Sequence, residues 1–200
     1  MRKMVSGSEG WLTINEGAAI KSGDSVKTAG DSRLEFELPG NGVFRLGPSS
    51  VIYIDTGETL KPDLIFGDMW AVFLSDGESA GAELPIVTVR SENAASRFSA
   101  GQDCSQEIKV YAGKLTSSRR IYSGYAKAAA NDDGNKHPCE TEPAENDSLN
   151  TLIETVEAGQ KMIITSQGRV VFKGPFVLDD PDENSEWVRW NNDRDRMRIR

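Results

Sequence analysis

Residues 33–46 read RLEFELPGNGVFRL, and this stretch decides the fold class. In residues 33–38 apolar and charged side chains alternate strictly, which is the period of a β-strand that is buried on one face. Residues 39–42 are a turn signal, and a strand pattern resumes at residues 43–46. The stretch therefore predicts a β-hairpin with one face in an apolar core and its charges on a solvated face.

Similar strand patterns recur along the chain, separated by turns that mostly contain glycine, at the spacing of about 8–12 residues typical of all-β folds. They cover residues 11–14, 51–54, 64–66, 69–74, 86–90, 95–100, 107–111, 115–116, 152–156, 159–164 and 169–173. Residues 69–74 are apolar on both faces, so this strand is expected in a central, covered position. The prediction is an all-β fold of ten or more short, mostly antiparallel strands, in a two-layer sandwich or a β-helical roll. The expected core side chains are Leu34, Phe36, Leu38, Phe44, Leu46, Ile52, Ile54, Val72, Ile108 and Val110.

The apolar period changes near the C-terminus, where a short α-helix is predicted. Asp180 is a suitable N-cap, and Pro181 suits the first helical position. Trp187 and Trp190 are three residues apart and share one apolar stripe of this helix. We expect them to be structural anchors on the β domain, and an exposed surface for a partner is the alternative. The arginines from Arg194 onward are expected in solvent, in weak surface ion pairs with the neighbouring aspartates.

Composition suggests how the chain is organised. It predicts a single β domain over residues 1–178. The helix, over residues 179–200, is expected to dock on this domain. Within the β domain, residues 124–150 are poor in apolar side chains and are expected to be a mobile acidic insertion. The surrounding residues 131–160 hold 8 acids and one lysine, a net charge of −7 out of −8 for the chain. Their acids do not follow the register of an EF-hand calcium loop, so no calcium site is predicted.

Two cysteines and one histidine limit the chemistry of the chain. Cys104 and Cys139 would pair in an oxidising compartment and stay free in cytosol. We expect the disulfide, because little else would hold the segment around Cys139, and closing a loop of about 35 residues would stabilise the fold by about 4 kcal/mol. His137 lies near Cys139 without a third ligand, so no metal site and no histidine-dependent catalytic triad is predicted.

Charge and hydropathy exclude two classes of partner. Nucleic-acid binding needs a basic face, and the only basic cluster, residues 194–200, is interleaved with acids in a chain of net charge −8. No run of 18 apolar residues is present, so no membrane span is expected. Residues 1–5 carry no signal-peptide pattern, so an exported protein would be represented here by its mature form or by an excised part of it.

The only candidates for acid–base catalysis near aromatic residues or strands are Asp68, beside Trp70, and the pair of Glu35 and Glu37. A glycan hydrolase or lyase needs two carboxylates a few ångström apart, one of them with a raised pKa. The alternation of the strand places Glu35 and Glu37 on a solvated face. We therefore predict no enzyme and no cofactor, with a carboxylate-dependent glycan hydrolase or lyase on a β scaffold as the alternative.

Several motifs, in their order along the chain, resemble the FecR domain family. They are residues 23–28 (GDSVKT), 30–36 (GDSRLEF), 41–50 (NGVFRLGPSS), 67–70 (GDMW), 110–115 (VYAGKL), 156–160 (VEAGQ) and 187–195 (WVRWNNDRD), and together they span roughly residues 10–195. Ser91-Glu92 replaces the Thr-Pro of the family, and residues 94–98, which begin Ala94-Ala95-Ser96, replace its Arg-Gly-Thr element. The chain resembles a divergent, cell-envelope type of FecR domain.

This resemblance implies an extracytoplasmic, periplasmic all-β module without catalytic activity. Such a module binds a protein partner or an envelope glycan, and some relatives relay the signal of an outer-membrane receptor to a sigma factor. Others stand alone or are envelope lipoproteins. This chain lacks the cytoplasmic helical region and the membrane span of the regulators, so the resemblance does not by itself establish a role in signalling.

Overall fold

The computed structural model describes residues 1–4, 10–55, 60–74, 80–120 and 151–198. Within these ranges the chain forms thirteen strands and one α-helix. In chain order they are β1 (Arg2–Met4), β2 (Leu12–Thr13), β3 (Ser25–Lys27), β4 (Leu34–Leu38), β5 (Gly42–Leu46), β6 (Val51–Ile54), β7 (Pro62–Phe73), β8 (Gly81–Leu84), β9 (Val87–Ala100), β10 (Gln106–Arg120), β11 (Thr151–Glu157), β12 (Gln160–Ile164), β13 (Val170–Pro175) and α1 (Glu186–Arg198). The prediction of an all-β fold with a short C-terminal helix is confirmed.

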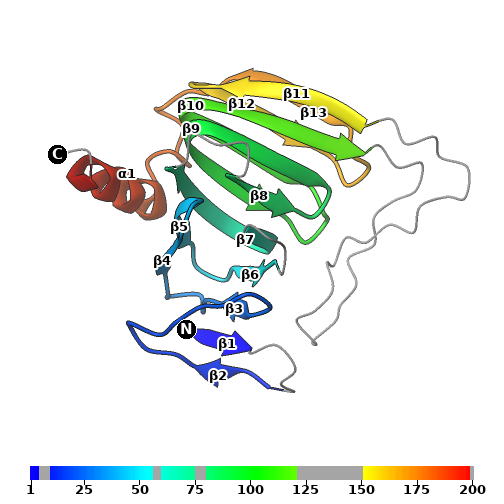
Figure 1. Ribbon diagram of the computed structural model, residues 1–200. Coiled ribbons are helices and arrows are strands. Elements are labelled where there is room, and N and C mark those ends of the chain that lie inside the picture. Colours follow the sequence, from blue (N-terminus) through cyan, green and yellow to red (C-terminus); the bar gives the residue numbers. More distant parts are fainter. Residues whose placement is uncertain (5–9, 56–59, 75–79, 121–150, 199–200) are drawn as a thin grey trace, which may run out of the picture.

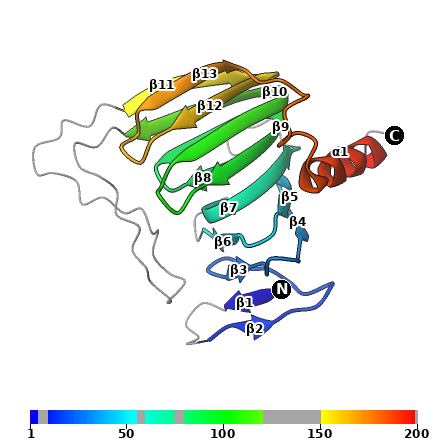
Figure 2. The same ribbon diagram turned by 180° about the vertical axis from the view of Figure 1, so that it is seen from behind.

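All strands belong to one sheet with the order β13-β12-β10-β9-β8-β7-β6-β3-β1-β2. β5 pairs with β7 and β4, β11 pairs with β10, and the single pairing of β7 with β8 is the one parallel contact among the described strands. The sheet runs from β11–β13 at one end of the molecule to β1 and β2 at the other, with α1 to one side near β5 (Figure 1). The view from behind shows the same arrangement (Figure 2). One apolar core takes side chains from strands β3 to β13, so the sheet folds around it.

The hairpin predicted from residues 33–46 is present as β4 and β5. Phe36 and Phe44 are cross-strand partners whose rings stack at 5.5 Å, and Phe73 meets Phe44 edge-on at 5.7 Å. Eight of the ten expected core side chains are buried. Leu34 is only partly buried against the core, and the prediction for Val72 is wrong, because it lies on the opposite face of β7.

Three pairs of predicted strands are merged in the structure. They form the long strands β7, β9 and β10. In β10 the expected break at Gly113 is a β-bulge. Gly113 has a φ of +70°, and a Cβ there would lie 2.1 Å from the carbonyl oxygen of Asn93. Only glycine fits this close approach of two backbones, so it bends a strand that continues on both sides.

The predicted start of the helix at Asp180 is wrong. Residues 181–184 form turns, and α1 begins at Glu186, where the Ser185 hydroxyl accepts a hydrogen bond from the N–H of Val188 at 3.3 Å. The carboxylates of Asp182 and Glu183 bind Lys109 on β10 instead of serving a helix N-terminus. A tertiary contact therefore decides the boundary of the helix.

Some predictions concern residues beyond the described ranges. The acidic insertion falls almost entirely on residues 121–150, which lie outside them, together with His137 and Cys139. In the described part of the chain, no helix has the length and apolar character needed to cross a membrane.

Candidate functional site

α1 and residues 176–185 cover the face of the sheet that lies opposite the main core. We call this contact with β4, β5, β7, β9 and β10 the helix seam. Its apolar centre is a second hydrophobic cluster in which Trp70 of β7 packs against Trp187 and Val188 of α1. Trp70 is 1% exposed and Trp187 is 7% exposed. The seam therefore buries Trp70 on the second face of β7, while Asp68 and Val72 on that face are partly buried.

Aromatic rings fill much of the seam. Trp70 stacks on Tyr111 at 4.4 Å, and Trp187 stacks on Trp190 at 5.5 Å. The indole N–H of Trp70 donates to the carboxylate of Asp195 at 3.0 Å. The structure thus brings the two predicted tryptophans together, with Trp187 buried and Trp190 partly buried. Whether they act only as anchors or also contact a partner stays a prediction.

Arg45 is the centre of one group of charges in the seam. This side chain is fully buried, its Nε donates to Glu35 at 2.7 Å, and its Nη1 forms an ion pair with Asp195 at 2.6 Å. Asn191 adds two acceptors at 3.3 Å. The expectation of a solvated face at Glu35 is therefore wrong, because α1 covers that face. Glu37, farther along β4, is exposed as predicted.

Asp195 corrects a second expectation. It was predicted in a weak surface pair, yet it holds both the guanidinium of Arg45 and the indole of Trp70. Arg194 is exposed as predicted, although its Nη1 lies 3.4 Å from a carboxylate oxygen of Glu35.

A second group of charges lies where residues 176–185 cross β9 and β10. Arg97 and Lys109 are direct cross-strand partners, so two cations lie side by side. Asp182 accepts hydrogen bonds from Arg97 at 2.7 Å and from Lys109 at 2.6 Å. Glu183 accepts from Lys109 at 2.7 Å and from the Tyr111 hydroxyl at 2.8 Å. The two acids neutralise a pair of like charges that would otherwise repel each other.

The pKa directions in this second group follow from its pairing. Burial by itself would raise the pKa of Asp182, but hydrogen bonds from Lys109 and Arg97 outweigh burial and lower it. Burial would lower the pKa of Lys109, but Asp182 and Glu183 raise it well above its usual range. Burial, followed by the hydrogen bond to Glu183, raises the pKa of Tyr111. These groups hold their protonation states near neutral pH, which suits a structural contact and does not suit proton transfer.

Two of the three acids of the hydrolase alternative, Asp68 and Glu35, are engaged in the same seam, while Glu37 is exposed. Asp68 accepts hydrogen bonds from Arg97 at 3.0 Å and from Ser99 at 2.6 Å. Glu35 is held by Arg45. Each of these two acids is therefore committed to an arginine of the seam.

The cysteine and metal predictions are only partly accessible to the structure. Cys104 is buried in a turn at a positive φ of 64°, while its predicted partner Cys139 lies outside the described residues. The disulfide stays a prediction. The described ranges contain no group of three or more His, Cys, Asp or Glu side chains that could hold a metal ion.

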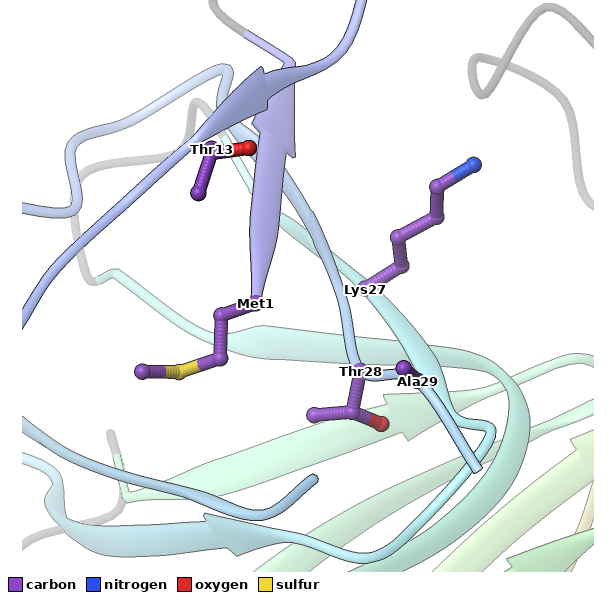
Figure 3. A pocket seen from close by; sticks show the side chains of 5 residues that line it. All are labelled: Met1, Thr13, Lys27, Thr28 and Ala29. Atoms are coloured by element: carbon purple, nitrogen blue, oxygen red, sulfur yellow. The ribbon is translucent and has the colours of Figure 1, made fainter. Parts of the chain in front are cut away.

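A pocket of about 320 Å³ lies near the β1–β2 end of the sheet (Figure 3). It is lined by Met1, Thr13, Lys27, Thr28 and Ala29. The ammonium of Lys27 lies 4.1 Å from the ring centre of Trp11, and the hydroxyl of Thr28 donates to the carbonyl of Gly47 at 2.6 Å. The polar ends of Lys27 and Thr28 are thus engaged by the protein, so these two side chains offer little to orient a ligand.

Sequence reasoning missed the buried cations of the seam, Arg45, Arg97 and Lys109. One local signal was available, since Glu35 and Arg45 face each other across the predicted hairpin. No local signal marked Asp182 and Glu183 as the acids that neutralise Arg97 and Lys109.

Comparison with known proteins places the fold. No known family model matches the sequence, and no curated protein matches it. Two crystal structures of a candidate anti-sigma factor from Parabacteroides distasonis have a similar fold, each with a TM-score of 0.51 and 13% sequence identity. Each match covers 76% of this chain and 59% of the other chain. At this identity the likeness shows a shared fold, and the chain spans about three fifths of the length of those proteins.

Proposed function

We propose that this protein is a non-catalytic, FecR-like module outside the cytoplasm that takes part in signal transduction across the cell envelope. It would do so by binding a protein partner or an envelope glycan. The observation that carries the proposal is the fold shared with a candidate anti-sigma factor over 76% of the chain. The ordered motifs that resemble FecR domains, from residues 23–28 to residues 187–195, support the same conclusion independently of that fold.

The arrangement of the charged side chains supports binding over catalysis. Asp68 and Glu35, the acids that the hydrolase alternative would use, each pair with an arginine in the helix seam. No specific observation in the described residues favours that alternative. The module is therefore proposed to act through its surface.

Site-specific photo-crosslinking in the native host tests this proposal. A photoreactive amino acid is placed in the full chain at Leu12, Leu74, Val171 or Leu178, which are 57–68% exposed and belong to β2, to β13 and to the segments that follow β7 and β13. We expect one site, or two adjacent sites, to crosslink an envelope protein or glycan, because a specific partner covers one part of the surface. The captured partner should then bind the purified chain.

Two results would contradict the proposal. One is crosslinking only to cytoplasmic proteins, or to no envelope component from any of the four sites. The other is release of new reducing ends when the purified chain is incubated with envelope glycans, which would restore the hydrolase alternative.

A further inference from the structure

A second pocket, of about 360 Å³, lies where the connection from β8 to β9 meets β10 and β11. It shares no residue with the helix seam. One part of its wall is acidic, with Asp63 and Glu83, and another part is the apolar stretch 84–87. Arg119 of β10 completes it. Its volume is at the lower end of the roughly 300–1,000 Å³ of small-molecule sites.

The acidic wall is built by the parallel contact of β7 with β8. Asp63 and Glu83 are direct partners in that contact, and the hydroxyl of Thr88 donates to Glu83 at 2.5 Å. Burial raises the pKa of Glu83, and the nearby charge of Asp63 adds to the rise. A cation bound between these two acids would stabilise the ionised form of Glu83. This wall of the pocket therefore favours an ammonium group.

Arg119 supplies the opposite charge. It is 4% exposed, its Nε donates to the carbonyl of Gly168 at 2.9 Å, and its Nη2 donates to Glu154 at 2.6 Å. Its remaining nitrogen, Nη1, is buried and has no hydrogen-bond partner among the described residues. A buried donor without an acceptor is costly, because it has lost its water and gained nothing in return. A ligand carboxylate would satisfy it.

We propose that this pocket binds a small zwitterion that carries an ammonium group, a carboxylate and an apolar side chain. The carboxylate accepts from Nη1 of Arg119, the ammonium faces Asp63 and Glu83, and the side chain packs on residues 84–87. This goes beyond the proposed function, which does not use the pocket. The shared chemistry fits a free amino acid or a dipeptide, and the test distinguishes these two sources.

Calorimetric titration of the full chain with four probes tests the site. The probes are L-leucine, leucinamide, which lacks the carboxylate, 4-methylpentanoate, which lacks the ammonium, and leucyl-leucine. We expect leucine to bind about tenfold or more tightly than either truncated analogue, because each analogue leaves one charged part of the pocket without its partner. Tighter binding of leucyl-leucine would identify a dipeptide as the natural ligand, and tighter binding of leucine a free amino acid.

Two variants assign the charges to their partners. Glu83→Gln is isosteric and should weaken leucine about tenfold while leaving 4-methylpentanoate unchanged. Arg119→Gln should weaken leucine similarly and leave leucinamide unchanged, with circular dichroism checking its fold because Arg119 also holds Glu154. Lys27→Gln in the other pocket is the control and should change nothing.

The proposal is overturned if leucine and its analogues bind equally, if none of the four probes binds, or if Glu83→Gln leaves leucine binding intact. Because the probes are compared on the unmodified chain, loss of fold in Arg119→Gln does not leave the question open.

Discussion

The two faces of β7 are both buried, but by different kinds of side chain. On the core face, Met69, Ala71 and Phe73 join an apolar cluster that takes residues from strands β3 to β13. On the seam face, Trp70 and Val72 meet α1 among buried arginine, lysine and carboxylate groups. β7 therefore makes an apolar contact on one face and a contact rich in charged groups on the other.

The difference has an energetic meaning. Apolar burial is non-directional, and many combinations of side chains of similar volume satisfy it. The seam depends on particular partners, since Arg45 without Glu35 and Asp195 would be a buried charge with a large desolvation cost. We infer that the core supplies most of the stability and that the seam fixes where α1 docks.

The largest expected effect comes from the core face. Phe44→Ala should lower the free energy of unfolding by about 3–5 kcal/mol, because this fully buried ring leaves a cavity between Phe36 and Phe73. Urea denaturation measures the change. Leu12→Ala, at a side chain that is 57% exposed, is the control and should change little. Equal effects of the two substitutions would mean that the core is not where the structure places it.

Breaking the charge group around Arg45 should lower the free energy of unfolding slightly less than Phe44→Ala does. Arg45→Met removes the cation between Glu35 and Asp195 and should destabilise the protein by about 3 kcal/mol, the low end for a buried pair, because both acids keep some contact with water. Replacing all three residues together with apolar ones should recover most of the loss. If Arg45→Met is as stable as the native chain in urea denaturation, these ion pairs do not form.

The two tryptophans of α1 should differ. Trp187→Ala should cost about 3 kcal/mol, at the low end for a buried aromatic ring. Trp190→Ala should cost about 1 kcal/mol, because its ring is only partly buried. Thermal denaturation should show the larger drop in melting temperature for Trp187→Ala. Unchanged stability in both, with both indoles readily quenched by acrylamide, would identify α1 as an exposed binding surface.

The smallest effect is the pH dependence of Asp182. Its pKa in the folded protein is lowered, so its stabilisation is present above the ordinary aspartate pKa of about 3.9 and is lost as the pH falls through the folded value. Asp182→Asn should cost less than about 1 kcal/mol at pH 7, since this side chain is 47% exposed. The difference in stability between Asp182→Asn and the native chain should vanish as the pH is lowered, which denaturation curves at a series of acidic pH values measure. A difference that grows on acidification would contradict the pairing.

Local pattern was enough to predict the strands and the core. Alternation in residues 33–38 and the turn after them identify β4 and β5 correctly, because a half-buried strand leaves its period in the sequence. The same alternation failed at Glu35, since a charged position looks the same whether water or a distant helix covers it. Gly113 similarly looked like a break and is a bulge, because its role depends on the neighbouring strand.

The seam and the second pocket depend on contacts between distant residues. Arg45 and Asn191 are 146 residues apart, and Lys109 and Asp182 are 73 apart. The pocket joins Glu83 of β8 with Arg119 of β10. No pattern within one segment could reveal these pairs, because the order of strands in the sheet decides them.

Hydrogen–deuterium exchange of the α1 backbone tests most directly the claim that the seam holds α1 docked on the sheet. A helix this short has little stability by itself, so its amides are protected only if it is docked. We predict that the amides of residues 190–196 exchange as slowly as those of β5 and β7. Arg45→Met should speed the exchange of α1 as well as that of the two strands. Exchange of α1 within seconds, while β5 and β7 stay protected, would show that the helix is undocked and would contradict the claim.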